Sequence, residues 1–227
     1  MVVLHHLENS RSQRVLWLLE ALGVPYEVKR YERNKTTMLA PPELKAVHPL
    51  GKSPVITDRD GDGERTIAES GAIIEYLIGR YGNGRLIPAE GTPQRLRYTY
   101  WLHYAEGSVM PLMVMKLVFS HLSSPPMPFV MRPVAGLIST GVQRKWLDPQ
   151  IDLHLNYIES ELGKSPWFAG DEMTGADIQM SFPLEAAASR GGLDQRYPKM
   201  TGFLRRIHAL PAYQRALEKG GPYRLLS

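Results

Sequence analysis

The stretch VITDRDGDGERTIAESGAIIEYL, residues 55–77, decides the fold of the first part of this chain. The segments VITD and ERTIA flank an Asp-Gly turn, which is the strongest short-range signal for a β-hairpin. The apolar residues that follow recur at helical spacing until Gly82. The stretch therefore predicts a hairpin followed at once by a helix over residues 71–81.

The same stretch also matches the pattern of a calcium-binding loop, which is satisfied by Asp58, Asp60, Asp62, Gly63 and Glu69. A loop of this kind lies between two helices, whereas the segment SPVIT before Asp58 favours a strand. Arg65 occupies a position that is normally apolar, and the sequence has no second loop to pair with this one. We therefore predict that the acidic run is a solvated hairpin tip and that the chain binds no metal.

Upstream of the hairpin, VVLHH at residues 2–6 and YEVKRY at residues 26–31 have strand patterns. The segment between them has apolar residues at helical spacing and stops at Gly23. A strand, a helix and a strand of these lengths form a right-handed βαβ unit with parallel strands. The order βαβ and then ββα is typical of a thioredoxin-like domain, which we place at residues 1–82.

Residues 82–93, GNGRLIPAEGTP, lose the periodicity and gather glycine and proline, so we expect a linker at residues 83–91. No convincing strand pattern follows, and residues 92–227 are predicted to form an all-α domain. Its helices are expected at residues 94–121, 142–162, 174–190, 198–209 and 211–219. The Pro-rich segment 123–133 is expected to be a lid or a packed loop. Thr174 and Asp177 have the spacing of a capping box, a folding element at a helix start.

The composition narrows the possible chemistry, because the 227 residues are 43% hydrophobic and include no cysteine. Disulfides, thiolate metal sites and a thiol nucleophile on the protein are excluded. No apolar run approaches the roughly 18 residues of a membrane span, and the strand at Val2 leaves no room for a signal peptide. We therefore expect no membrane partner and no export. The net charge of +4 lies in residues 85–227 without a basic block, which argues against a nucleic-acid partner.

Two short segments have the chemistry of a ligand site. Ser70 at the predicted helix start offers a hydroxyl and unpaired N–H groups, which suit a carboxylate, and Glu69 can accept from an ammonium group. A ligand with an amino-acid head fits both, although a capping serine beside a surface glutamate is the simpler interpretation of these two residues alone. Ser53 precedes Pro54 and is held extended, so its backbone can pair with a peptide, while Lys52 offers a cation nearby.

The segment LGKSP, the hairpin and the Glu-Ser pair, placed between a βαβ unit and an all-helical domain, resemble a glutathione S-transferase. The resemblance covers the whole chain and is most specific over residues 2–82. It implies that Pro54 follows a cis peptide bond, that Ser53 binds the cysteinyl backbone of glutathione, and that Lys52 lies near the glycyl carboxylate. It also implies that Glu69 and Ser70 hold the γ-glutamyl head. Glutathione is thus the implied co-substrate.

In this family the residue that activates the glutathione thiol lies near the end of the first strand. That strand ends here in two histidines where tyrosine-type members have a tyrosine, and the composition excludes the cysteine type. Serine-type members place a serine four residues before an arginine, and Ser10 with Arg14 has that spacing. Ser10 is therefore the expected activator. Asn9 and Ser12 remain rivals, since either could cap the helix instead.

The resemblance implies a cytoplasmic, homodimeric glutathione transferase that joins the thiolate to hydrophobic electrophiles. The alternatives are a glutathione-dependent disulfide reductase or peroxidase, and a non-catalytic relative that carries a ligand or binds a partner; the retained ligand residues argue against the latter. The second substrate is expected to be an electrophile or peroxide lying against the helical domain. The apolar candidates for its pocket are Tyr98, Trp101, Met110, Met113, Met115, Met127 and Phe129, of which core packing and dimer contacts explain at least half.

Overall fold

The structure is a computed structural model that describes residues 1–61, 63–189, 192–223 and 225. Its first part contains β1 (Val2–Leu7), α1 (Ser12–Leu22), β2 (Tyr26–Tyr31), α2 (Glu43–Val47), β3 (Val55–Asp60), β4 (Gly63–Ala68) and α3 (Ser70–Tyr81). The strands form one sheet in the order β2-β1-β3-β4, in which β1 and β2 are parallel and the other pairs antiparallel. The predicted βαβ and ββα units are confirmed.

The acidic run of the hairpin differs from the prediction. Asp58 lies within β3, is fully buried, and accepts hydrogen bonds from the hydroxyls of Tyr76, at 2.9 Å, and Tyr81. Burial by itself would raise the pKa of Asp58, but these hydroxyls and the N-terminal ammonium hold it below its usual value. A buried carboxylate needs such donors, so this residue is a structural anchor and not part of a solvated tip. Asp62 lies outside the described residues.

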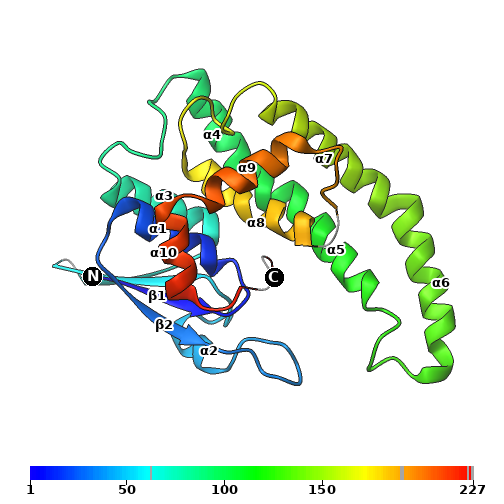
Figure 1. Cartoon of the computed structure of the whole chain (residues 1–227). Helices are drawn as coiled ribbons and strands as arrows, with labels where there is room; N and C mark the ends of the chain where they lie inside the picture. The colour runs from blue at the N-terminus through cyan, green and yellow to red at the C-terminus, as the bar shows by residue number, and fades with distance from the viewer. Residues whose placement is uncertain (62, 190–191, 224, 226–227) are drawn as a thin grey trace.

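The second part is helical, as predicted, and Figure 1 shows its helices beside and beyond the sheet. One rod consists of α4 (Pro93–Tyr104), a π-helical turn (Ala105–Val109) and α5 (Met110–Ser120). The next consists of α6 (Arg132–Val142), a second π-helical turn (Gln143–Leu147) and α7 (Asp148–Leu162). They are followed by α8 (Gly175–Ser189), α9 (Pro198–His208) and α10 (Pro211–Gly220).

The expected lid at residues 123–133 is instead the bend between α5 and α6, and it includes a 3-10 turn at Phe129–Met131. The helix expected from residue 142 begins already at Arg132. Pro133 does not prevent this, because N–H groups in the first helical turn have no partner to lose. Together, residues 110–147 form an arm that projects from the rest of the molecule (Figure 1).

One apolar core joins the two parts of the chain. The start of α8 packs closely on α3: a Cβ added at Gly175 would lie 2.6 Å from Ile78 and 2.8 Å from Ile74, so this approach requires glycine. The Thr174–Asp177 capping box is formed, since the Thr174 N–H and hydroxyl donate to the Asp177 carboxylate at 2.8 and 3.0 Å. The helical region is thereby held against the helix that carries Ser70.

The last helix returns to the first part of the chain. The rings of Trp17 in α1 and Tyr213 in α10 meet edge to face, with centroids 5.3 Å apart. Glu20 of α1 accepts from Lys219 at 2.6 Å and from Arg215 at 2.7 Å. The sequence pattern predicts this helix, but not that it covers α1. Among the described residues, no helix is long and apolar enough to cross a membrane.

Candidate functional site

Ser10, Lys52 and Ser53 line one cavity of about 460 Å³, which we call the Ser10 cavity. Ser10 follows β1 and precedes α1, while Lys52 and Ser53 belong to the loop that enters β3. Asn9 also lines this cavity, and Phe182 contributes an aromatic ring from α8. The fold thus brings together residues from the end of one strand and the start of another, over 40 positions apart in the chain.

The loop before β3 is tied to the central strand. The Ser53 hydroxyl donates to the backbone carbonyl of His5 at 3.0 Å, and the Ser53–Pro54 peptide bond is cis, as the resemblance implied. Pro54 is buried, whereas the Lys52 side chain is exposed at the cavity. The exposed ammonium is therefore available to an anionic ligand group, while the two residues after it fix the loop.

Glu69 and Ser70 line a second cavity of about 520 Å³, the Ser70 cavity, together with Glu106 and Gln179 from the helical region. The Arg11 guanidinium, which lines the Ser10 cavity, donates from Nε to both oxygens of Glu106 at 3.0 Å. This ion pair connects the linings of the two cavities. A ligand long enough to occupy both would pass beside it.

The Ser70 hydroxyl does not cap α3 as predicted. The helix begins at Ser70 itself, with Glu69 as N-cap at φ 70°, and the Ser70 Oγ accepts from the Arg14 guanidinium at 2.9 Å. Arg14 is 2% exposed and also donates to the Gln179 carbonyl at 2.6 Å and to Glu106. A buried guanidinium needs several acceptors, and it takes this hydroxyl as one of them.

The Arg14 contact decides what Ser70 can do for a ligand. Because the Ser70 oxygen accepts from Arg14, its own proton remains to be donated elsewhere. The hydroxyl is also adjacent to the N-terminus of α3, whose N–H groups and dipole favour an anion. The arrangement suits a carboxylate beside Ser70 and an ammonium beside the exposed carboxylate of Glu69.

A chain of hydrogen bonds runs inward from Ser10. Ser10 Oγ lies 2.8 Å from Ser12 Oγ and accepts from the Ser12 backbone N–H at 3.2 Å, and Ser12 Oγ lies 2.9 Å from His6 Nδ1. Ser12 is fully buried and does not line the Ser10 cavity. Its side chain therefore holds Ser10, whereas Ser10 and Asn9 are the two candidates for direct contact with a ligand thiol.

Both histidines of β1 are buried and have partners. Burial lowers the pKa of His6 to about 4, so its ring is neutral at pH 7. Burial also lowers the pKa of His5, whose ring nitrogens lie 2.9 Å from the Tyr31 hydroxyl and 3.1 Å from the Thr57 hydroxyl. These are structural histidines. Within the described part of the chain, no three His, Asp or Glu side chains are arranged to hold a metal ion.

Of the apolar residues named for a second-substrate pocket, more than half pack in the core, as was expected for at least half of them. Tyr98, Trp101, Met110 and Met113 are buried in the core, and Phe129 is 81% exposed at the far end of the arm. None of the seven candidates lines either cavity. The apolar lining of the Ser10 cavity includes Leu39, Leu50 and Phe182.

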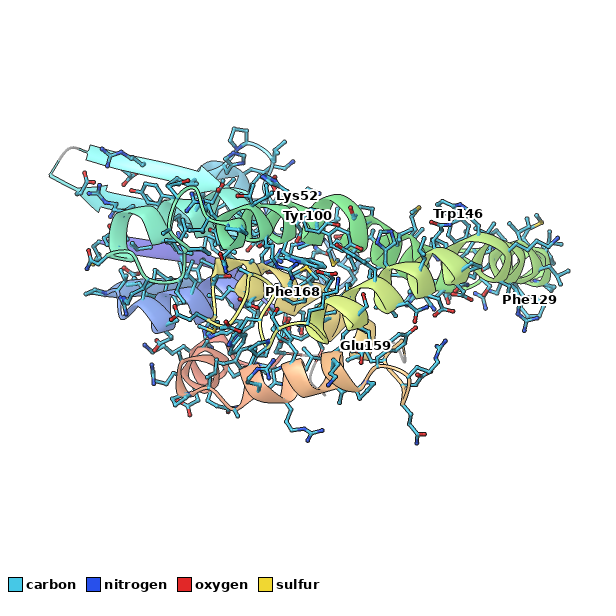
Figure 2. The ribbon with its side chains drawn as sticks, turned by 90° about the horizontal axis from the view of Figure 1, so that it is seen from above. Lys52, Tyr100, Phe129, Trp146, Glu159 and Phe168 are labelled. Atoms are coloured by element: carbon cyan, nitrogen blue, oxygen red, sulfur yellow. The ribbon has the colours of Figure 1, made fainter. Side chains whose placement is uncertain are left out.

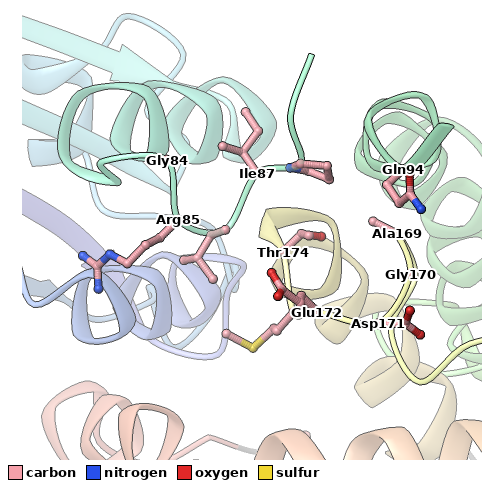
Figure 3. A pocket seen from close by; sticks show the side chains of 12 residues that line it. Gly84, Arg85, Ile87, Gln94, Ala169, Gly170, Asp171, Glu172 and Thr174 are labelled. Atoms are coloured by element: carbon pink, nitrogen blue, oxygen red, sulfur yellow. The ribbon is translucent and has the colours of Figure 1, made fainter. Parts of the chain in front are cut away.

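A further cavity, of about 420 Å³, lies between residues 84–88 and the loop that precedes α8 (Figure 3). Its lining includes Arg85, Gln94 and Thr174, and none of the six predicted site residues. The Arg85 guanidinium donates to the Leu22 carbonyl at 2.8 Å, and Thr174 belongs to the capping box. Arg85 and Thr174 thus serve the junction between the two parts of the chain.

Residues 10–79 match the family described as Glutathione S-transferase, N-terminal domain, and residues 110–211 match Glutathione S-transferase, C-terminal domain. Glutathione S-transferase 3 of Schizosaccharomyces pombe is 39% identical over 220 residues, which cover 96% of this chain and 88% of that protein. The disulfide-bond oxidoreductase YfcG of Escherichia coli is 26% identical, over 96% of this chain and 95% of that protein.

Solved structures agree with these matches. A glutathione S-transferase from Actinobacillus pleuropneumoniae has a TM-score of 0.77 at 34% identity, over 99% of this chain and 94% of that one. A glutathione transferase family member from Pseudomonas fluorescens, solved with two glutathione bound, has a TM-score of 0.75 at 25% identity, over 96% and 92%. The chain belongs to the glutathione S-transferase family.

Proposed function

We propose that this chain is a glutathione transferase that binds glutathione across the two neighbouring cavities and joins it, through its thiolate sulfur, to hydrophobic electrophiles. The observation that carries the proposal is the convergence of Ser10, Lys52 and Ser53 on one cavity and of Glu69 and Ser70 on its neighbour. An extended tripeptide with two carboxylates and one ammonium has the charges that these positions complement.

In the proposed complex, the γ-glutamyl carboxylate accepts from Ser70 and from the N–H groups at the start of α3, and its ammonium donates to Glu69. The cysteinyl backbone pairs with that of Ser53, and the glycyl carboxylate lies near Lys52. The cysteine sulfur then reaches the part of the Ser10 cavity where β1 meets α1. Leu39, Leu50 and Phe182 offer an apolar wall for the second substrate.

The proposed activator is Ser10, whose hydroxyl donates to the sulfur and favours the thiolate. An ordinary thiol has a pKa near 8.5, and lowering it by about two units requires roughly 2.7 kcal/mol. One hydrogen bond to a charged acceptor supplies about 1.5 to 3 kcal/mol, and the start of α1 adds a smaller term. The thiolate then attacks the electrophilic carbon, a carbon–sulfur bond forms, and the leaving group departs with its electron pair.

The test is calorimetry with reduced glutathione, followed by turnover of the same preparation with an aryl halide. Binding with a dissociation constant in the millimolar range or tighter, and a conjugation rate above the uncatalysed one, support the proposal. Absence of glutathione binding by the folded protein would remove its basis.

A second candidate is a glutathione-dependent disulfide reductase, which the likeness to the oxidoreductase YfcG favours. The lack of cysteine is no obstacle, because one glutathione thiolate attacks a disulfide and a second glutathione releases the first as oxidised glutathione. Turnover with a small mixed disulfide, but not with an aryl halide, would select this reaction; turnover with an organic peroxide would indicate a peroxidase. Glutathione binding without turnover would indicate a ligand-carrying module.

We also propose a cytoplasmic, two-fold symmetric homodimer. The family resemblance supports it, as do the exposed side chains of Leu96 and Tyr100 on one face of α4. Sedimentation at micromolar concentration tests the assembly, since a species of 25.6 kDa would be the monomer. Cell fractionation tests the location.

A further inference from the structure

The outer end of the arm exposes an unusual amount of apolar surface. Six large apolar side chains within ten consecutive positions are between 49% and 81% exposed, and we call them the tip patch: Phe129, Val130, Met131, Val134, Leu137 and Ile138. Figure 2 shows Phe129 at the end of the arm that is remote from Lys52 and the main body. Isolated apolar side chains are normal on a surface, but a contiguous group of this kind marks an interaction site.

The tip patch is one face of an amphipathic helix. The opposite face of α6 is buried against α5, where Ala135 and Ser139 are both 5% exposed and the Ser139 hydroxyl donates to the Phe119 carbonyl at 2.6 Å. Val134, Leu137 and Ile138 follow at helical spacing on the outer side. The helix is therefore held in place by α5 while its outward apolar face has no partner among the described residues.

The charge of the arm is equally one-sided. Residues 110–147 contain four cations, Lys116, Arg132, Arg144 and Lys145, and no Asp or Glu, so the arm alone carries the same formal charge of +4 as the whole chain. Lys116 pairs with Asp148 at 2.9 Å, but Arg144 and Lys145 are exposed and form no ion pair with any described residue. Trp146, 48% exposed, follows directly.

We propose that the arm docks on an anionic lipid surface, with the tip patch inserted at the boundary between head groups and acyl chains. Lys145 follows Leu137 by eight positions, about 12 Å along a helix. An amphipathic helix lies along the interface with its apolar face buried by about 5–10 Å, so Arg144 and Lys145, further along the same rod, are placed to meet the head groups, and a tryptophan beside them suits the interface. Apolar insertion combined with basic residues is the composition that binds membranes peripherally.

The charge also decides between a lipid surface and a second copy of the chain. Two arms that each carry an excess of positive charge repel, whereas a cytoplasmic leaflet rich in anionic lipid attracts them. The sequence suggested no membrane partner because it lacks a span, but peripheral docking needs none, and the exposed face of α6 becomes visible only in the folded chain. The inference is independent of the proposed enzymatic activity.

The experiment is co-sedimentation of the full chain with vesicles of phosphatidylcholine alone or with added phosphatidylserine. We expect binding to the anionic vesicles that weakens with salt. Removing the two free cations (Arg144→Ala with Lys145→Ala) is expected to lower the partition constant about 30-fold, while Lys35→Ala with Lys199→Ala changes it little. Phe129→Ser with Leu137→Ser is expected to lower it at least about tenfold, and Leu153→Ser, at a leucine on α7 that is 62% exposed, to leave it unchanged.

Melting temperatures check that each variant is folded. Equal binding to neutral and anionic vesicles would overturn the proposal, as would binding that neither pair of arm substitutions reduces. If the wild-type chain ignores vesicles and Phe129→Ser with Leu137→Ser instead dissociates an oligomer in sedimentation, the tip patch is a contact between copies of the chain and the proposal is wrong.

Discussion

Arg14 Nη2 donates to Ser70 Oγ at 2.9 Å, which links the first helix of the chain to the start of the third. The same guanidinium holds Glu106 and the Gln179 carbonyl from the helical region. One buried side chain therefore positions the proposed carboxylate-binding hydroxyl and joins the two parts of the molecule. Arg14, whose spacing from Ser10 indicated a serine-type member, therefore has a structural role of its own.

Replacement of this arginine tests the link. Arg14→Met is expected to lower the free energy of unfolding by about 2–4 kcal/mol, because Glu106 and the Gln179 carbonyl lose a buried donor. Arg11→Met removes the other partner of Glu106, but Arg11 is about one third exposed, so its loss is expected to cost no more than about 1 kcal/mol. Urea unfolding measures both. An equal loss of unfolding free energy in the two variants would show that Arg14 stabilises the fold no more than Arg11 does.

The proposed head-group site predicts a loss of glutathione affinity in Ser70→Ala and Glu69→Ala. Each variant removes one charge-assisted hydrogen bond, worth about 1.5–3 kcal/mol, so the dissociation constant is expected to rise roughly 10- to 150-fold. Calorimetry measures the change. Glu75→Ala is the matched control, since this exposed carboxylate lines the same cavity on the next turn of α3 and has no proposed ligand contact. Unchanged affinity in both site variants would exclude the site.

The proposed role of Ser10 predicts a change in thiol ionisation rather than in binding. Ser10→Ala is expected to retain glutathione, to raise the pKa of the bound thiol by about one to two units, and to cut conjugation roughly 10- to 100-fold. The ultraviolet absorbance of the thiolate, followed against pH, gives that pKa directly. Ser12→Ala is expected to have a smaller effect, because Ser12 does not line the cavity and its hydroxyl contacts Ser10, His6 and the Leu7 carbonyl.

Asn9→Ala decides between the two residues that line the Ser10 cavity near the end of β1. Normal turnover by Ser10→Ala, together with a raised thiol pKa in Asn9→Ala, would move the activating role to the asparagine.

Burial of His6 predicts how stability depends on pH. The unfolded chain protonates His6 near pH 6.5 and the folded chain only near pH 4, so acidification favours the unfolded state. The contribution is fully present above pH 6.5 and is lost as the pH falls toward 4, by about 3 kcal/mol in total. His6→Asn has no titrating group there, so its free energy of unfolding is expected to fall less over this range. Parallel pH profiles in wild type and variant would contradict this account.

Much of the first domain was determined by local sequence. The β-branched segments around an Asp-Gly turn and the apolar periodicity after Ser70 specify a hairpin and a helix, because period-two and period-3.6 patterns bury different faces. Short motifs also singled out Lys52, Ser53, Glu69 and Ser70 as candidate ligand-binding residues, since each has a chemical reason to lie at a strand or helix start. In the folded chain, those residues line two cavities whose linings are linked by the Arg11–Glu106 ion pair.

Tertiary structure alone decided how these groups are used. Asp58 looked solvated in the sequence but is buried, because α3 packs beside β3 and brings the hydroxyls of Tyr76 and Tyr81 to its carboxylate. Ser70 looked like a helix cap in the sequence, but its hydroxyl accepts a hydrogen bond from Arg14 instead. A buried guanidinium has five N–H donors and therefore needs several acceptors. Glu106 lines the Ser70 cavity from a π-helical turn, which the hydrophobic pattern of the sequence does not predict.

The placement of the last helix and the arm has the same origin. The helices at residues 211–220 and 132–142 are both amphipathic. The apolar face of the first is covered by α1, whereas the apolar face of the second is exposed at the tip patch. Hydrophobic periodicity predicts which face of a helix will be buried, but it does not predict which element that face packs against. That is settled by contacts between residues far apart in the chain, as between Trp17 and Tyr213, and these exist only once the chain is folded.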